Sequence, residues 1–290
     1  MSQAEKDAVE DRLSRAIEAY HEAALLYAAV KLALSEKMGA SSWKAEHLAQ
    51  LLGLSAPHLA RFLRGLCLVG ICEERADGSL ALTAFGRSLT PESKLAQKVQ
   101  IVVEQYWLPW ANLAETLQSG APAFAQVFGA TVVDWRRDHP EQGALFASYL
   151  SKATQADTAA VLAALLSETD KVVEIDSANA LRTATLSNAD LYLLTGVLQN
   201  YDDAGALAIL RNCRAAMRNG ARLVIVERLM PEHAADDPAA IMLDLHLMTI
   251  YGGRARTLAE LEALLFAARL ELSKMTPTRS GLAVVECLTT

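Results

Sequence analysis

The sequence predicts two domains: a mainly α-helical domain over residues 1–165, followed by an α/β domain over residues 166–290. Three observations support this prediction. The chain has 290 residues, of which 52% are hydrophobic and 21% charged, enough for two ordinary cores. Helical patterns dominate the first part. After Asp170, short apolar runs alternate with helical ones, which is typical of a mostly parallel sheet covered on both faces.

The predicted helical domain begins with a long apolar arm. Residues 4–38 place Ile17, Leu25 and Leu32 among polar residues and many alanines, a pattern that predicts a long helix broken near Gly39. An apolar arm of this kind needs a partner surface to cover it.

The next segment has the pattern of a winged helix. In order, we expect a helix over 43–52, a turn over 53–56, a helix over 57–69, and strands over 71–74 and 80–82. Pro57 opens the second helix, and Asp77-Gly78 between the two strands is a strong hairpin signal. Residues 89–169 are expected to be mostly helical.

A winged helix can bind DNA, so the charge of this module matters. Residues 41–90 contain five basic residues and four acidic ones, a net charge of +1, within a chain whose net charge is −7. Phosphate contacts supply most of the non-specific affinity for DNA, and +1 is a poor basis for them. We therefore expect a packing and dimerisation module and no nucleic-acid partner.

The predicted α/β domain has strands and helices in alternation. Strands are expected over 171–176, 190–194, 221–227 and 281–288, and helices over 204–217, 241–251 and 258–270. Asn219-Gly220 supplies a left-handed cap after the first of these helices.

Composition also excludes several classes of protein. The four cysteines form no CxxC pair and lie near no histidine cluster, so we expect neither a disulfide scaffold nor a metal site. The sequence has no uncharged apolar run of 18 residues and no basic segment leading into an apolar one. We expect a cytoplasmic protein with no membrane segment.

Many short motifs resemble those of the small-molecule O-methyltransferases that depend on S-adenosylmethionine. In the first part these are Leu48-Ala-Gln-Leu-Leu-Gly-Leu54, Leu63-Arg-Gly-Leu66, Val69-Gly70, Leu82-Thr83 and Phe85-Gly86. In the second part they are Leu210-Arg-Asn-Cys-Arg-Ala-Ala-Met217, Val226-Glu-Arg-Leu-Met-Pro-Glu232, Met242-Leu-Asp-Leu-His-Leu-Met248, Gly252-Gly253, Arg256-Thr257 and Ser280-Gly281. The resemblance implies a winged-helix dimerisation domain, a Rossmann-like domain and an intertwined homodimer formed through the N-terminal helices.

The expected cofactor site departs from the family pattern. In the stretch from Glu174 to Ala180, Asp176, Ala178 and Ala180 stand where the family has glycines, so side chains occupy the approach of the cofactor. Residues 177–189 are too few for the two βα units that would bind ribose and adenine, because each unit needs about 25 residues or more. A reduced sheet of about five strands is expected, with residues 171–176 at its edge.

We therefore expect no cofactor, with S-adenosylmethionine binding only if the sequence is incomplete. Lys171, Glu174 and Asp176 are charges of the kind that protect an edge strand. A different alignment with the family stays open, in which Val172-Val173 corresponds to a later element of the family's domain.

The catalytic position departs as well. The family places a histidine base just after the fourth strand, and Gln199 stands there in this chain. An amide cannot take a proton near neutral pH, although it can orient a substrate. Glu227 and Glu260 match the carboxylates that flank the family's base. We expect Glu227 to act in proton transfer, with a solvated or capping role as the alternative for Glu260.

The resemblance also implies an acceptor pocket. Met242, His246 and Thr249 share one face of the helix that the family places against its acceptor. His246 is a candidate acid or base, and a purely hydrogen-bonding role is its alternative. Four further residues are expected to bind the substrate: Tyr106, Trp107, Asn200 and Asp244.

Three functions follow from these patterns. The leading hypothesis is a family member that acts on a small aromatic or polyketide-like molecule in secondary metabolism without methyl transfer; other chemistries occur in the family. The second is an active O-methyltransferase whose sequence is incomplete. The third is a non-catalytic dimerisation partner of such an enzyme.

Overall fold

The computed structural model describes residues 2–153, 165, 171–175, 180–181 and 189–289. The chain divides into two compact units, each described by itself below. Unit 1 comprises residues 1–107 and 145–149, and unit 2 comprises residues 108–144 and 150–290. The predicted domain boundary after residue 165 adjoins residues outside the described ranges and stays a prediction.

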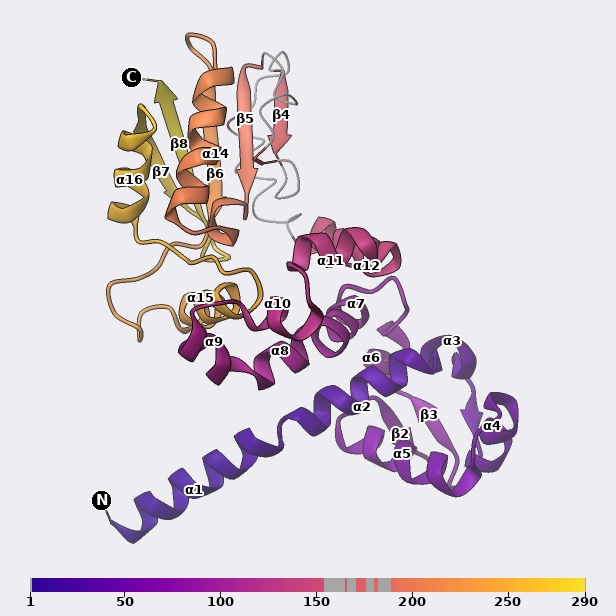
Figure 1. The fold of residues 1–290 in the computed structure, drawn as a ribbon. Coiled ribbons are helices and arrows are strands. Elements are labelled where there is room, and N and C mark those ends of the chain that lie inside the picture. Colours follow the sequence, from indigo (N-terminus) through magenta and orange to yellow (C-terminus); the bar gives the residue numbers. More distant parts are fainter. Residues whose placement is uncertain (1, 154–164, 166–170, 176–179, 182–188, 290) are drawn as a thin grey trace. The chain divides into compact units, whose positions relative to one another are not determined.

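Unit 1 contains the winged helix that the sequence predicts. Its elements are α1 (Gln3–Glu18), α2 (Tyr20–Lys31), α3 (Leu34–Met38), β1 (Ser42–Trp43), α4 (Ala45–Leu52), α5 (Ala56–Leu68), β2 (Cys72–Glu74), β3 (Leu80–Leu82), α6 (Ala84–Ser88), α7 (Lys94–Ile101) and the π-helix η1 (Val102–Tyr106) (Figure 1). The hairpin strands β2 and β3 pair antiparallel, and the short strand β1, which was not predicted, pairs with the other edge of β3.

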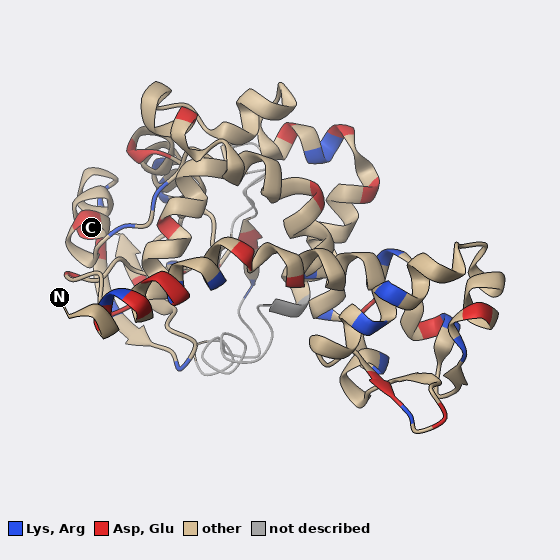
Figure 2. Ribbon diagram, turned by 90° about the horizontal axis from the view of Figure 1, so that it is seen from below, with Lys and Arg blue, Asp and Glu red and all other residues tan. Residues whose placement is uncertain are grey.

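The core of unit 1 lies between the helices and the hairpin. Leu48 of α4, Leu63 and Leu66 of α5, Ile71 and Leu82 are all buried in one cluster. These positions follow the helical and strand periods of the sequence, which is why the module could be predicted. Figure 2 shows that both signs of charge occur on this module, consistent with its net charge of +1.

The N-terminal arm is helical, as predicted, but it is divided near Ala19 and again at Leu32–Ala33. None of the residues of α1 is buried. Val9, Leu13 and Ile17 lie four residues apart, so they form one apolar stripe, and Ile17 is 73% exposed. Within unit 1 this stripe is uncovered.

Unit 2 combines a five-stranded sheet with two groups of helices. Its elements are α8 (Trp107–Ala111, which begins at the end of unit 1), α9 (Leu113–Ser119), α10 (Ala123–Phe128), α11 (Val132–Asp138), β4 (Val172–Ile175), β5 (Leu191–Thr195), the 3-10 helix η3 (Leu198–Asn200), α14 (Asp203–Ala216), β6 (Arg222–Glu227), α15 (Pro238–Ile250), α16 (Leu258–Ala267), β7 (Leu270–Pro277) and β8 (Ala283–Thr289). Helix α12 (Pro140–Ala153) contributes to both units.

The sheet has the order β4-β5-β6-β8-β7. The first three strands are parallel, whereas β8 runs antiparallel to both β6 and β7. The five strands confirm the reduced α/β sheet, and the expectation of a mostly parallel sheet is corrected by the β7–β8 pair. The helix expected to reach residue 270 ends at Ala267, because Arg269 adopts a left-handed conformation (φ 58°) and β7 begins after it.

One face of the sheet packs against α14 and α16, with Tyr192, Ile209 and Leu265 buried between the layers (Figure 1). Leu191, Val224 and Val284 form the core of the opposite face. In the described part of the chain β4 pairs only with β5, and Val172 and Glu174 on it are exposed. The predicted edge position of this strand therefore holds for the residues described.

Two further findings concern the described residues alone. None of their helices is both long and apolar enough to cross a bilayer. No group of three or more His, Cys, Asp and Glu side chains among them could hold a metal ion.

Candidate functional site

The predicted catalytic residues Gln199 and Glu227 meet at the carboxyl ends of β5 and β6. Because these strands are parallel neighbours, the turn after β5 lies against the last residue of β6. The backbone N–H of Gly196 donates to the Val226 carbonyl at 2.9 Å, and the backbone N–H of Gln199 donates to Glu227 Oε1 at 3.0 Å. The sheet topology thus fixes this pair.

Glu227 is buried, with 6% of its surface exposed. Burial raises the pKa of its carboxyl to about 7, while backbone N–H groups of residues 197–199 and the positive charge of Arg256 oppose this rise. A carboxyl with this pKa is present in both protonation states near neutral pH. It is therefore the residue of this site that can take up and release a proton.

Gln199 lies on η3 and is half-buried. Its side-chain carbonyl Oε1 is buried and has no hydrogen-bond partner in the part of the chain that the structure describes. The neighbouring Asn200 donates from Nδ2 to the Gly196 carbonyl at 3.0 Å, so it stabilises the same turn. An amide oxygen with an open acceptor position can hold a hydroxyl or amine, but it cannot serve as a base.

The segment 251–256 after α15 packs on this turn. A Cβ on Gly253 would lie 2.1 Å from the Gln199 carbonyl oxygen, so only glycine allows the two backbones to approach this closely. The buried guanidinium of Arg256 donates to the carbonyls of Leu198 (3.0 Å) and Tyr201 (2.9 Å) and to Asp203 (2.9 Å). Arg256 therefore holds both ends of η3 in place.

Two predicted residues contribute to this segment through the backbone. Asp244, expected to bind substrate, accepts a hydrogen bond at 2.8 Å from the N–H of Ala255. Glu260 forms a capping box with Thr257 at the start of α16 and an ion pair with Arg254. These contacts lower the pKa of Glu260, the backbone N–H of Thr257 having the largest effect. The structure thus shows the capping arrangement considered for Glu260.

His246 lies in an aromatic cluster of unit 2. Its ring stacks on Trp110 of α8, and the indole N–H donates to Nδ1 at 3.2 Å. The ring of Tyr251 meets it edge-on, with centroids 6.2 Å apart. Burial and the charge of Arg136 lower the pKa of His246 to about 4. Because Nδ1 accepts a hydrogen bond, the neutral ring bears its proton on Nε2, which favours the hydrogen-bonding role over that of a base.

The other residues on this face of α15 have different environments. Met242 is exposed, whereas Thr249 is buried and donates its hydroxyl to the Leu245 carbonyl at 2.7 Å. Tyr106 and Trp107 belong to unit 1, where the Trp107 and Tyr20 rings lie 6.2 Å apart. The substrate-binding roles of these four residues stay predictions.

The predicted cofactor residues are only partly described. Glu174 lies on β4 with an exposed side chain, and Asp176 and Ala178 fall outside the described residues. Fifteen residues, 176–190, connect β4 to β5. That length suffices for one crossover between parallel strands, but not for two more βα units. The length of this connection agrees with the sequence-based expectation for this segment, and the predicted loss of the cofactor site stays a prediction.

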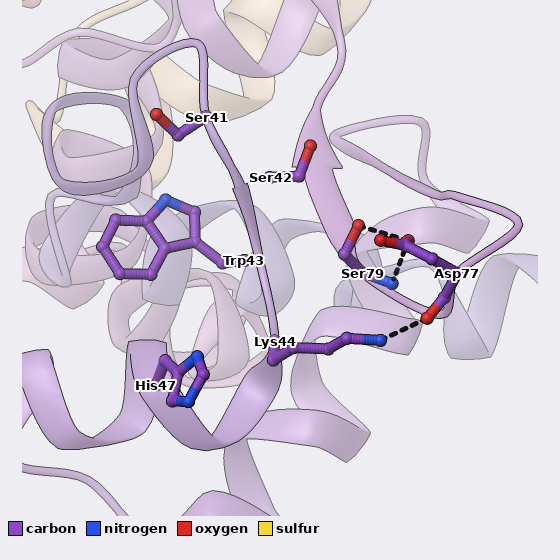
Figure 3. Close-up of a pocket in the computed structure, with 7 residues that line it drawn as sticks. All are labelled: Ser41, Ser42, Trp43, Lys44, His47, Asp77 and Ser79. Atoms are coloured by element: carbon purple, nitrogen blue, oxygen red, sulfur yellow. Dashed lines mark hydrogen bonds between the residues drawn. The ribbon is translucent and has the colours of Figure 1, made fainter.

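A separate pocket of about 450 Å³ occurs in unit 1 (Figure 3). It is lined by Ser41, Ser42, Trp43, Lys44, His47, Asp77 and Ser79. Lys44 donates to the backbone carbonyl of Asp77, whose carboxylate accepts hydrogen bonds from the N–H (2.9 Å) and hydroxyl (2.6 Å) of Ser79. Lys44 and the Asp77 carboxylate thus each have a hydrogen-bond partner within the pocket lining, and none of the predicted site residues lines this pocket.

Sequence reasoning did not assign Trp110, Arg136, Tyr251, Gly253 or Arg256 to the site. A signal existed for the segment after α15, where two glycines and two arginines follow Tyr251. No local signal distinguishes Arg136 from its neighbour Arg137, because burial of one arginine of a pair depends on the packing of the whole unit.

Comparison with known proteins places these features in context. The O-methyltransferase domain family matches residues 167–270. The phenazine O-methyltransferase PhzM of Lysobacter antibioticus is 28% identical over 312 aligned positions, which cover 90% of this chain and 91% of that protein. A 2,7-dihydroxy-5-methyl-1-naphthoate 7-O-methyltransferase of Streptomyces carzinostaticus is 25% identical and covers 89% and 92% of the two chains.

The fold is also found among solved structures. The crystal structure of LaPhzM superposes with a TM-score of 0.83 at 26% identity, covering 97% of this chain and 99% of that one. The alignment with PhzM of Lysobacter antibioticus also contains positions that this chain lacks. Since 90% of 290 residues is about 261, about 51 of its 312 positions lie opposite no residue of this chain.

Proposed function

Because this chain belongs to the S-adenosylmethionine-dependent O-methyltransferase family, we propose that it acts on a small hydroxylated aromatic or polyketide-like molecule of secondary metabolism, without transferring a methyl group. The two relatives described above are named for a phenazine and a dihydroxynaphthoate, both aromatic. The acceptor side of unit 2, with η3, α15 and the segment 251–256, supports the first half of this proposal.

The short connection between β4 and β5 carries the second half. With fifteen residues between these strands, the chain has no room for the units that would bind the nucleoside of the cofactor. The shortage of about 51 positions against PhzM of Lysobacter antibioticus corresponds to two βα units of about 25 residues each, which supports a loss inside the chain. Gln199 in place of the histidine base supports the same proposal.

Glu227 is then the group that holds the reacting proton. A carboxyl with a pKa of about 7 can accept a proton from a phenol or donate one to a carbonyl oxygen at neutral pH. The backbone N–H of Gln199 binds Glu227, and the side-chain amide oxygen of the same residue is the group that would orient the substrate hydroxyl.

Calorimetry on the purified 31.3 kDa chain tests the proposal. We expect 1-naphthol to bind and S-adenosylmethionine and S-adenosylhomocysteine not to bind, with no methylated product from 1-naphthol. Micromolar affinity for either cofactor form would overturn the claim that methyl transfer is lost. Absence of binding by 1-naphthol would count against the aromatic acceptor. An intact mass clearly above 31.3 kDa would support the alternative of an active enzyme with further residues.

The variant Gln199→His separates the loss of the base from the loss of the cofactor site. It restores an imidazole at the family's catalytic position on an element held by Arg256. If the cofactor site is missing, methyl transfer stays absent in this variant. The appearance of methylated 1-naphthol would show that only the base had been lost, and the active-enzyme alternative would replace our proposal.

We also propose a homodimer formed through the N-terminal helices and the winged helix, in the cytoplasm and without a nucleic-acid partner. The apolar stripe Val9, Leu13 and Ile17 supports this, since it is uncovered within unit 1. Light scattering after size exclusion is expected to give twice the chain mass, and Leu13→Glu with Ile17→Glu is expected to give the monomer. Phe266→Glu, at an 83% exposed position on α16, is the matched control and leaves the dimer intact. A monomeric unmodified chain would contradict the proposal.

A further inference from the structure

Arg256 is a buried cation whose hydrogen bonds are directed at one turn. It is 3% exposed. Its Nη1 donates to the Leu198 carbonyl at 3.0 Å and its Nη2 to the Tyr201 carbonyl at 2.9 Å, so the planar guanidinium bridges the two ends of η3. Its Nε donates at 2.9 Å to Asp203, the first residue of α14. Burying a guanidinium costs free energy unless its N–H groups are bonded, and here two of its three acceptors are backbone carbonyls of the turn.

The same turn presents its backbone N–H groups to Glu227. The N–H of Gln199 donates to Glu227 Oε1 at 3.0 Å, and the N–H groups of Val197 and Leu198 also act on this carboxyl. Leu198 thus directs its N–H toward Glu227 while its carbonyl accepts from Arg256. A shift of η3 away from the guanidinium would also displace these donors from the carboxylate. The cation and the carboxyl are therefore coupled through one short element.

This coupling affects the proton of Glu227. Burial raises the pKa of its carboxyl to about 7, and the N–H of Gln199 and then the charge of Arg256 are the largest influences that oppose this rise. Among the described residues, Arg256 is the charged side chain whose field acts on Glu227, whereas η3 contributes neutral groups. Without these influences Glu227 would stay protonated at neutral pH, and it could donate a proton but not accept one.

We propose that Arg256 is a positioning residue for proton transfer by Glu227. By bridging the carbonyls of Leu198 and Tyr201, it keeps the N–H groups of the turn against the carboxylate, so that both forms of Glu227 are available at neutral pH. Asp203 holds the guanidinium in this orientation. The inference rests on the proposed function, in which Glu227 holds the reacting proton.

Infrared spectroscopy of the full chain, without any ligand, tests the inference. Ordinary carboxyls are ionised near pH 7, so the protonated-carboxyl band that disappears in Glu227→Gln belongs to this residue. Its titration is expected to have a midpoint at about pH 7 in the unmodified chain. Arg256→Lys keeps the positive charge, but a single ammonium lacks the planar fork that bridges both carbonyls. We expect the midpoint of Glu227 to rise by about one pH unit in this variant.

Two further variants complete the test. Arg254→Lys is the matched control, because the ion pairs of Arg254 lie at the surface, and its midpoint is expected within about 0.3 pH units of the unmodified chain. Arg256→Met removes the charge as well as the fork, and we expect a rise of about two pH units. If Arg256→Met fails to fold, Arg256→Lys still tests the inference.

A reduced stability of Arg256→Lys with an unchanged midpoint of Glu227 would overturn the inference, because Arg256 would then stabilise the fold without acting on the proton. A shift as large in Arg254→Lys as in Arg256→Lys would also overturn it. The titration needs no ligand, so its outcome is separate from the calorimetry with 1-naphthol that tests the proposed function.

Discussion

The two sides of the C-terminal sheet differ in how their side chains are held. At the carboxyl ends of β5 and β6, Glu227 and Arg256 are buried and bonded to backbone groups of one turn, and Gly253 allows the next segment to pack on it. On β4, the neighbour of β5 at the edge of the described sheet, Val172 and Glu174 are exposed. One sheet thus joins a tightly constrained region to a loosely constrained one.

This difference indicates where the chain tolerates change. The constrained region depends on backbone approach, a buried cation and a buried carboxyl, and each of these is costly to disturb. Substitutions of Val172 and Glu174 on β4 change exposed side chains and are expected to have small effects. Under the proposed function, the acceptor side would stay intact although part of the cofactor side has been lost.

The largest expected effect is that of Gly253→Ala. Its Cβ would meet backbone atoms of residues 199–201 at 2.1–2.7 Å, and backbone cannot move aside as a flexible side chain can. We expect the free energy of unfolding of unit 2 to fall by about 4 kcal/mol. The measurement is urea unfolding followed by circular dichroism, with Glu174→Gln on β4 as the control, expected within about 0.5 kcal/mol. Equal stability of both variants would remove the contrast between the two sides.

Arg256→Met is expected to have the next largest effect. It leaves the carbonyls of Leu198 and Tyr201 without their donor, and we expect a loss of about 3 kcal/mol. Arg254→Met, two residues away, is the matched control. Arg254 is 43% exposed and its ion pairs with Asp203 and Glu260 lie at the surface, so its loss is expected to cost less than about 1 kcal/mol. A loss in Arg254→Met as large as that in Arg256→Met would show that exposure does not determine the cost.

The sequence predicted those parts of the molecule whose pattern is local. The winged helix follows from helical periods, Pro57 and Asp77-Gly78, and the buried strands β5 and β6 follow from continuous apolar runs. The meeting of Gln199 with Glu227 follows from their places at the ends of parallel strands. These are the features that one segment or one pair of neighbours determines.

Features that depend on packing between distant segments could not be predicted. Strand β7 is largely exposed and polar, and Arg269, which ends the preceding helix in a left-handed conformation, gives no glycine signal. The burial of Arg136 rather than Arg137 depends on Tyr251, 115 residues away. The assignment of Asp244 to a backbone contact likewise depends on the path of the chain after α15.

The pH dependence of the free energy of unfolding of Glu227→Gln tests the same comparison. The folded-state pKa of Glu227 is raised from 4.5 to about 7, so the unfolded chain ionises first and the folded state loses stability as pH rises through this window. We expect the unmodified chain to lose about 2 kcal/mol of its free energy of unfolding over this pH window, and the variant to lack this loss. His246, whose pKa is lowered to about 4, acts oppositely, since it loses stability as pH falls below its unfolded pKa. Urea midpoints of Glu227→Gln and of His246→Gln, each compared with the unmodified chain between pH 4 and 8, measure the two slopes. Differences of the same sign would contradict the assignment.

The smallest expected effect belongs to the second family carboxylate, Glu260, and its sign is opposite to that of Glu227. Glu260→Ala removes the return bond of the capping box on Thr257, and we expect a loss of about 1 kcal/mol at pH 7. Because the pKa of Glu260 is lowered, its stabilisation is present above the unfolded pKa and disappears as pH falls through the folded one. Relative to the unmodified chain, Glu227→Gln is therefore expected to become more stable between pH 4 and pH 7, whereas Glu260→Ala is expected to become less stable. The sequence resemblance predicts the same family role for both glutamates. Opposite slopes in these two variants would show that burial, and not residue type, determines which carboxyl can carry a proton near neutral pH.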